Sequence, residues 1–288
     1  MPSLPRSKGT LAGSIVAGLI GALLGVAPVT SAMAQEKTAP PDFSSNFAGW
    51  VGLNGGGPFY EPAPGRLPAP VISDPAHPFV PNGVDKPPTF RIADLSNLNL
   101  KPWVKEVMKK DIDEILAGKK SAFTPQSSCV PAGVPFFMGY GGPDPIVFAQ
   151  TPKEIWMLWR EDNQTRRIFM DVPHSANPKP SWYGESIGHY EGDTLVIDTI
   201  GLNTKTVVDI YRTPHSEKLH VVERWRIIDG GKMMEVIFTV EDPDAFNEPW
   251  TGMRRYRRAE QEGYEKICAE NNVNIFDYHM PEADKPDF

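Results

Sequence analysis

Residues 185–201 constrain the fold most, because two runs of alternating side chains meet at Gly192-Asp193. A dipeptide with Gly first, placed between two such runs, is typical of a two-residue β-hairpin turn. In that register three residue pairs face each other: Glu191 and Thr194, His189 and Val196, and Ile187 and Asp198. An imidazole and two carboxylates then share one face: His189, Glu191 and Asp198. The opposite face carries Tyr190, Leu195 and Ile197.

The same period of two recurs along the second half of the chain and predicts eight strands. They cover residues 146–150, 154–159, 166–171, 185–191, 194–200, 219–228, 233–241 and 250–257. Turn residues separate several of them at hairpin-like lengths, which favours an antiparallel meander. About eight strands are enough to close a small barrel. The fold class that we expect is therefore mainly β, with a small lipocalin-like barrel.

The rest of the chain divides into flanking segments. Residues 35–101 hold 12 of the 30 prolines and show no sustained period, which indicates an arm. The arm also carries several aromatic residues, so we expect part of it to lie against the folded body. Pro102 opens a helix with an apolar stripe that ends at Gly118, and a second short helix is expected over 264–271. Residues 102–272 form the helix-plus-barrel domain, and 273–288 are a C-terminal tail.

The first 34 residues predict an export signal. Arg6 and Lys8 precede an uncharged run over residues 11–26, and a small-x-small site ends at Ala34, so cleavage is expected near Gln35. The alternative is an uncleaved membrane anchor, although the run is shorter than the roughly 20 residues that a spanning helix needs. We therefore predict a periplasmic or secreted protein without a membrane span after signal removal.

Charge excludes one class of partner. The chain carries 29 Lys and Arg against 36 Asp and Glu, and removal of residues 1–34 takes away two basic residues and no acidic one. The remaining 27 basic residues leave a net charge of −9. Such a chain is unsuited to coating nucleic acid. The partner that we expect is a small molecule, and the sequence leaves the oligomeric state open.

The two cysteines, Cys129 and Cys268, both lie in the exported part. Two thiols in an oxidising compartment most often pair, so a disulfide is expected. Free structural thiols and a catalytic cysteine are the alternatives. A disulfide would join the chain end to the segment before the first predicted barrel strand.

The polar face of the hairpin is the first candidate site. His189 lies diagonally across from Asp198 and forms a suitable base and orienting carboxylate, provided that the face opens to substrate. The alternative is a solvated outer face, with the apolar side of the hairpin in the core. A long polar loop begins at His174 and ends near Trp182, and it could overhang a barrel mouth and contact substrate.

Glu223 is the second candidate, because alternation places it on the apolar side of its strand, between Val221 and Trp225. A carboxylate in that setting must be paired, hydrogen-bonded or raised in pKa. Arg254, which shares a face with Tyr256, offers a partner. The site is either a buried Glu223–Arg254 ion pair, or a general acid or base beside side chains that bind substrate. The candidate binding residues are Arg254, Tyr256, Arg224, Trp225, Trp182 and His174.

Metal and cofactor motifs are missing from the sequence. His215 and His220 suggest a metal site with Glu223, but positions 220 and 223 point to opposite faces of a regular strand. The chain has no HExxH, CxxC or EF-hand pattern. We therefore expect no bound metal and no cofactor.

Five motifs resemble those of a large group of exported bacterial proteins of unassigned function. They are Ser186 to Leu195, Pro214 to Ser216 with His220 to Arg224, Asp242-Pro243 with Pro249-Trp250, Arg254 to Tyr256, and Cys268 to Asn272. The resemblance spans roughly residues 98–272. It implies added weight on five candidate catalytic residues: His189, Asp198, His215, His220 and Glu223.

Together these patterns predict an exported enzyme that acts on a small, partly apolar molecule, such as an aromatic one, by acid/base chemistry of the lyase, isomerase or hydratase type. In this hypothesis a His or Glu moves a proton, and Arg254 or Arg224 holds an anionic group. The alternative is a periplasmic binding protein or carrier without catalysis. A structural envelope protein that uses the arm is a third possibility.

Overall fold

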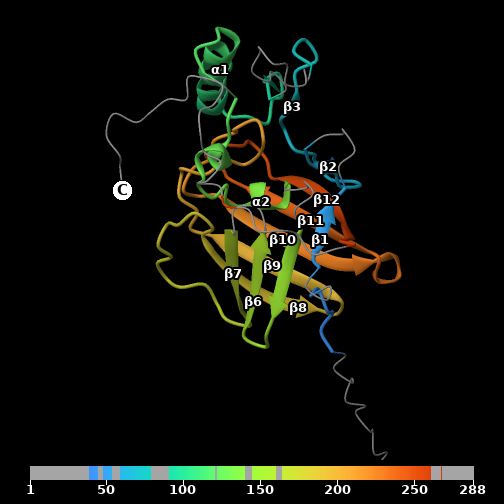
Figure 1. The fold of residues 1–288 in the computed structure, drawn as a ribbon. Helices are drawn as coiled ribbons and strands as arrows, with labels where there is room; N and C mark the ends of the chain where they lie inside the picture. Colours follow the sequence, from blue (N-terminus) through green and yellow to red (C-terminus); the bar gives the residue numbers. More distant parts are fainter. Residues whose placement is uncertain are drawn as a thin grey trace, which may run out of the picture. The chain divides into compact units, whose positions relative to one another are not determined.

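Nine strands close into a barrel in the computed structural model of this chain (Figure 1). The structure describes residues 39–44, 48–53, 59–78, 91–120, 122–139, 145–159, 164–260 and 267. The expected export signal, Cys268 and the C-terminal tail lie outside the described residues, as does the second helix except for residue 267, so the Cys129–Cys268 disulfide stays a prediction. The mainly β, lipocalin-like barrel is confirmed, with one strand more than the eight expected.

All eight expected strands are present, with ends that differ from the prediction by at most two residues. They are β5 (Ile146–Gln150), β6 (Glu154–Trp159), β7 (Gln164–Met170), β8 (Glu185–Glu191), β9 (Thr194–Ile200), β10 (His220–Ile228), β11 (Met233–Glu241) and β12 (Trp250–Arg258). The β8–β9 hairpin has the predicted register, and Gly192 has the positive φ of 62° that the turn requires. Local alternation was therefore a sufficient guide to these strands.

The ninth barrel strand, β1 (Trp50–Gly52), comes from the proline-rich arm. It pairs antiparallel with both β12 and β5 and thereby closes the barrel. A second arm strand, β2 (Glu61–Pro62), lies on the same edge of β12, at Gly252 and Met253. The arm thus does more than lie against the body. Two or three residues are too few for a visible alternation, which is why the pattern along the arm did not predict these strands.

One pair of neighbouring strands departs from the expected antiparallel meander. β7 and β8 are parallel, with Ile168 opposite Ser186 and Met170 opposite Gly188. Consecutive parallel strands need a connection long enough to run back along the barrel. Here residues 171–184 make that return, and most of them are exposed. This connection carries His174 back to the start of β8.

Aromatic side chains fill much of the described barrel interior. Trp225 stacks on Tyr256, with ring centroids 5.7 Å apart, and meets Phe148 edge-on. Trp50 and Phe238 are also fully buried. Each ring pair of this kind contributes about 0.5–1.5 kcal/mol beyond the burial of its area. The inward face is thus mainly a packed core.

The helix α1 (Pro102–Leu116) and the strand β3 (Ile72–Ser73) lie at one end of the barrel (Figure 1). α1 begins with Pro at its first turn and is followed by Gly118 at a φ of 68°, as expected. α2 (Phe136–Gly139) is a single buried turn, and β3 pairs with β4 (Ala93–Asp94). Within the described residues no helix is long and apolar enough to span a membrane.

Candidate functional site

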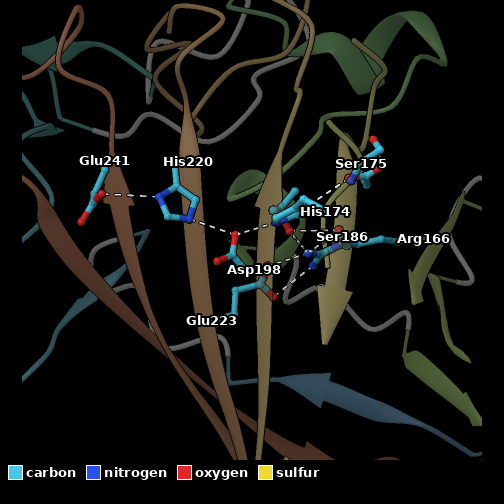
Figure 2. Close-up of polar contacts among 10 residues, drawn as sticks. Arg166, His174, Ser175, Ser186, Asp198, His220, Glu223 and Glu241 are labelled. Atoms are coloured by element: carbon cyan, nitrogen blue, oxygen red, sulfur yellow. Dashed lines mark hydrogen bonds and ion pairs between the residues drawn. The ribbon is translucent and has the colours of Figure 1, made fainter. Parts of the chain in front are cut away.

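A line of hydrogen-bonded carboxylates and histidines crosses the outer face of the barrel (Figure 2). Asp198 Oδ1 lies 3.0 Å from His174 Nε2 and 2.9 Å from His220 Nε2. At the outer ends, His174 Nδ1 is 3.0 Å from Glu185 Oε1, and His220 Nδ1 is 3.4 Å from Glu241 Oε2. We call these five residues, Glu185, His174, Asp198, His220 and Glu241, the histidine–carboxylate chain.

Strand register explains most of this arrangement. Val222 faces Asp198 across β10 and β9, so His220, two residues earlier on the same side, is a diagonal neighbour of Asp198. His220 also faces Glu241 directly across β10 and β11. His174 comes from the 171–184 connection, where the Ser175 amide and hydroxyl both donate to Glu185. The parallel β7–β8 pair therefore brings the second imidazole to the site.

The histidine–carboxylate chain is only partly buried. The side chains of His174, His220 and Asp198 are 20%, 32% and 36% exposed, so water and a small molecule can reach them. Burial opposes the charge of Asp198, but hydrogen bonds from both histidines outweigh it and lower its pKa. The same hydrogen bond to Asp198 raises the pKa of His220 above its usual value. Hydrogen bonds from Ser175 lower the pKa of Glu185.

Hydrogen-bond geometry limits where protons can lie in the histidine–carboxylate chain. Both nitrogens of His174 face carboxylate oxygens, so only a doubly protonated ring donates to both. His220 differs, because its contact with Glu241 is long and Glu241 is 50% exposed. His220 can therefore donate from Nε2 to Asp198 and leave Nδ1 for another partner. A His whose tautomer is fixed by a carboxylate is a suitable general acid or base.

The expected pair of His189 and Asp198 is wrong. Both residues lie on the predicted face, but this face is the outer one, and His189 is 51% exposed beside Glu191 at 3.1 Å. Arg224 also binds Glu191, at 2.6 Å, on the same exposed surface. Asp198 instead serves His174 and His220. The hairpin register determined the face on which Asp198 lies. Its hydrogen-bond partners come from the next strand, β10, and from the 171–184 connection.

Glu223 lies on the inward side of β10 and is fully buried, as its position in the alternation indicated. Its partner is not Arg254 but Arg166 of β7, whose guanidinium makes two hydrogen bonds to the carboxylate, at 2.6 and 3.0 Å. Trp225 Nε1 donates to the same carboxylate. Arg166 also donates to the hydroxyls of Ser186 and Thr199. Every charged atom in this network therefore has a partner, which is typical of a structural ion pair.

The other candidate residues are distributed between core and loops. His215 is buried against Thr206 Oγ1 and the Ser216 carbonyl, and burial lowers its pKa. Tyr256 donates to the Met138 carbonyl, and burial raises its pKa. Arg254 donates to the Phe59 and Gly139 carbonyls. Trp225 is buried, and Trp182 is half-buried in the connection before β8. None of these residues joins the histidine–carboxylate chain.

A cavity that the sequence did not indicate lies between the arm and the segment around Asp209. Its volume is about 400 Å³, and its walls come from β2, β3, β4 and residues 209–211. Burial raises the pKa of Asp209 to about 6. The unusually aromatic composition of the arm, at Phe59 and Tyr60, was the available signal.

No group of three or more His, Cys, Asp or Glu side chains in the described part of the chain is arranged to hold a metal ion. Comparisons with family models, with curated proteins and with solved structures gave no match.

Proposed function

We propose that this chain is an exported enzyme that acts on a small, partly apolar molecule by acid/base chemistry, of the lyase, isomerase or hydratase type. One observation supports this most. Two imidazoles donate to a single oxygen of Asp198 on a surface that solvent reaches. Such a pair can accept and supply protons within one site.

His220 is the proton-transfer group in this proposal, and Asp198 and His174 position it. A neutral His220 that donates from Nε2 to Asp198 carries its lone pair at Nδ1. Glu241 is half-exposed and can turn away from that nitrogen. Nδ1 then takes a proton from a substrate carbon. In an isomerase reaction the proton returns to a neighbouring atom, and in a dehydration it leaves with the departing hydroxide as water.

The ionisation of His220 suits this role. The hydrogen bond to Asp198 raises the pKa of His220 above its usual 6.5, so the ring holds its proton to higher pH than a free imidazole does. Proton transfer is most effective when the pKa of the group lies near the working pH. The buried Arg166–Glu223 pair lies on the inner face of the barrel wall and joins β7 to β10 across β8 and β9.

The test is turnover by matched variants. The mature chain is incubated with a small-molecule extract of the source culture, and products are followed by mass spectrometry, which includes separation of isomers of unchanged mass. We expect a product with the wild type, and loss of about 100-fold or more with His220→Gln, the scale of a lost general acid or base. His189→Gln, on the same face but bonded to Glu191 rather than to Asp198, is the control and should retain activity.

Equal turnover by His220→Gln and the wild type would remove this proposal. A product that forms at the same rate with Asp198→Asn would remove the positioning role of Asp198. Circular dichroism of each variant shows whether the barrel remains folded.

The second candidate function is a small-molecule binding protein or carrier without catalysis. The cavity beside Asp209 favours it, because a volume of about 400 Å³ is within the range of ligand pockets. Tight capture of a compound from the same extract, with no product, would support this function over the first.

A further inference from the structure

The cavity between the arm and residues 209–211 has mainly apolar and aromatic walls. Phe59 and Tyr60 contribute rings from the arm, and Tyr211 contributes one from the opposite side. Pro68, Pro70 and other apolar side chains complete much of the wall. Such a surface excludes water from an apolar ligand, and ring faces also attract a cation.

The charges at this cavity are of one sign. Among the residues that line it, Asp94 and Asp209 are acidic, and none is Lys, Arg or His. Asp209 is only 3% exposed. In the described part of the chain no salt bridge reaches either carboxylate, whereas buried carboxylates usually have a cationic partner.

The nearest cation along the chain makes its hydrogen bonds elsewhere. Arg212 Nε donates to Asp111 of α1, and its NH2 group donates to the Arg91 carbonyl. Burial raises the pKa of Asp209, and the charge of Arg212 still lowers it, but by less. Asp209 accepts the amides of Tyr211 and Thr213 and the Thr213 hydroxyl, and these contacts supply no full positive charge.

We infer that this cavity binds a small apolar amine, with the ammonium group near Asp209 and Asp94 and the apolar body against the aromatic walls. The inference rests on the binding role given above as the second candidate function. It shares no residue with the histidine–carboxylate chain, so the two proposals succeed or fail separately.

Three probes of nearly equal size separate charge from shape: phenethylamine, phenethyl alcohol and phenylacetate. Their affinities for the mature chain are measured by isothermal titration calorimetry at neutral pH. We expect the amine to bind about tenfold or more tightly than the alcohol, which corresponds to one favourable charge contact. Phenylacetate should bind most weakly, because both carboxylates repel it.

Two variants locate the binding. Asp209→Asn keeps the hydrogen-bonding shape and should abolish the preference for amine over alcohol. Ala69→Phe places a ring in the cavity and should weaken both probes by about tenfold or more. Asp193→Asn, at the exposed turn between β8 and β9, is the matched control and should bind as the wild type does. If Asp209→Asn does not fold, the wild-type probe series and the Ala69→Phe variant still test whether the amine binds in this cavity.

Equal affinity for amine and alcohol would overturn the inference, as would no binding of any probe. Amine binding that neither Asp209→Asn nor Ala69→Phe weakens would place the ligand elsewhere and would also overturn it. His220→Gln should bind the amine as the wild type does. Its turnover can be lost or retained independently, which separates this result from the acid/base proposal.

Discussion

Two carboxylates on adjacent strands show how one barrel wall gives the same side-chain group different roles. Asp198 on β9 points outward, is partly hydrated and accepts from two imidazoles. Glu223 on β10 points inward and is enclosed with a guanidinium. The raised pKa of His220 lets that ring keep its proton to higher pH, whereas the Arg166–Glu223 pair holds both charges in place. The proposed function assigns the chemistry to Asp198 and its histidines and leaves Glu223 a structural role.

Replacement of Glu223 by Gln should strongly destabilise the fold. The variant leaves the Arg166 guanidinium charged and fully buried without its carboxylate. Loss of one partner of a buried ion pair typically costs about 3–5 kcal/mol. We expect a lower free energy of unfolding by that amount, measured by urea denaturation.

The double variant Arg166→Met, Glu223→Leu provides the control for this prediction. It removes both charges, and the Ser186 and Thr199 hydroxyls still bond each other at 2.9 Å. It should recover part of the lost stability, because apolar residues of similar volume often replace a buried pair without cost, while Trp225 Nε1 loses its acceptor. A Glu223→Gln variant as stable as the wild type would show that the pair contributes nothing. Glu191→Gln, which breaks an exposed pair with Arg224, should have a much smaller effect.

At the scale of residues, the sequence predicted which side chains share a strand face but not which residues they bond to. Period-two alternation placed Glu223 on the apolar side of its strand and put His189 and Asp198 on one shared face, because side-chain direction is a local property of a strand. It left open whether that shared face meets a pocket or solvent. Arg166 lies on β7, three strands away from β10 around the barrel and 57 residues away in sequence, so no local pattern could have selected it over Arg254. His174 was expected only as a loop residue, because its contact with Asp198 depends on the path of the whole connection.

At the scale of elements, the parallel β7–β8 pair is the feature that the sequence could not predict. Strand ends follow from local alternation and turn residues, and they agree with the structure closely. Strand order depends on pairing between distant segments. A connection of polar residues between β7 and β8 is compatible with either a parallel or an antiparallel pair. The consequence is that the return of residues 171–184 places His174 next to Glu185 and Asp198.

The His220–Asp198 contact should make the β9–β10 wall less stable at higher pH. The folded pKa of His220 is raised above the unfolded value of 6.5, mainly by its hydrogen bond to Asp198. Its stabilisation is therefore fully present below pH 6.5 and is lost as the pH rises through the folded pKa. Asp198, whose pKa is lowered from 3.8, remains ionised throughout this window.

The measurement compares the wild type with His220→Gln by urea denaturation at about pH 5.5 and about pH 8.5. The difference in unfolding free energy should be larger at the lower pH, although partial exposure reduces its size. His189→Gln, with its 51% exposed side chain, should show a smaller difference at both values. A difference that is constant or that grows with pH would contradict the predicted ionisation of His220.

At the scale of the whole molecule, the proline-rich arm completes the barrel. Composition indicated a segment outside the core, and its aromatic residues indicated contact with the body. The structure assigns it a larger role, because β1 joins β12 to β5 and Trp50 enters the core with its Nε1 donating to the Phe43 carbonyl. Three residues of strand are enough to close a sheet when both neighbours are already in place.

Removal of β1 should therefore open the barrel. A chain that begins after Leu53 lacks the strand and leaves the edges of β5 and of the end of β12 without a partner. Unpaired edges are templates for association with other chains. We expect this chain to form large species in static light scattering and to lose cooperative unfolding by heat.

A chain that begins at Ala39 is the matched control, because it keeps Phe43, Trp50 and all of β1 while it lacks the residues before them. It should remain dispersed and unfold in one transition. If the shorter chain matched it in both measurements, the seam between β5 and β12 would be stable without β1. The contacts of β1 would then accompany closure of the barrel rather than cause it, and the arm would be free to act as a lid or a tether.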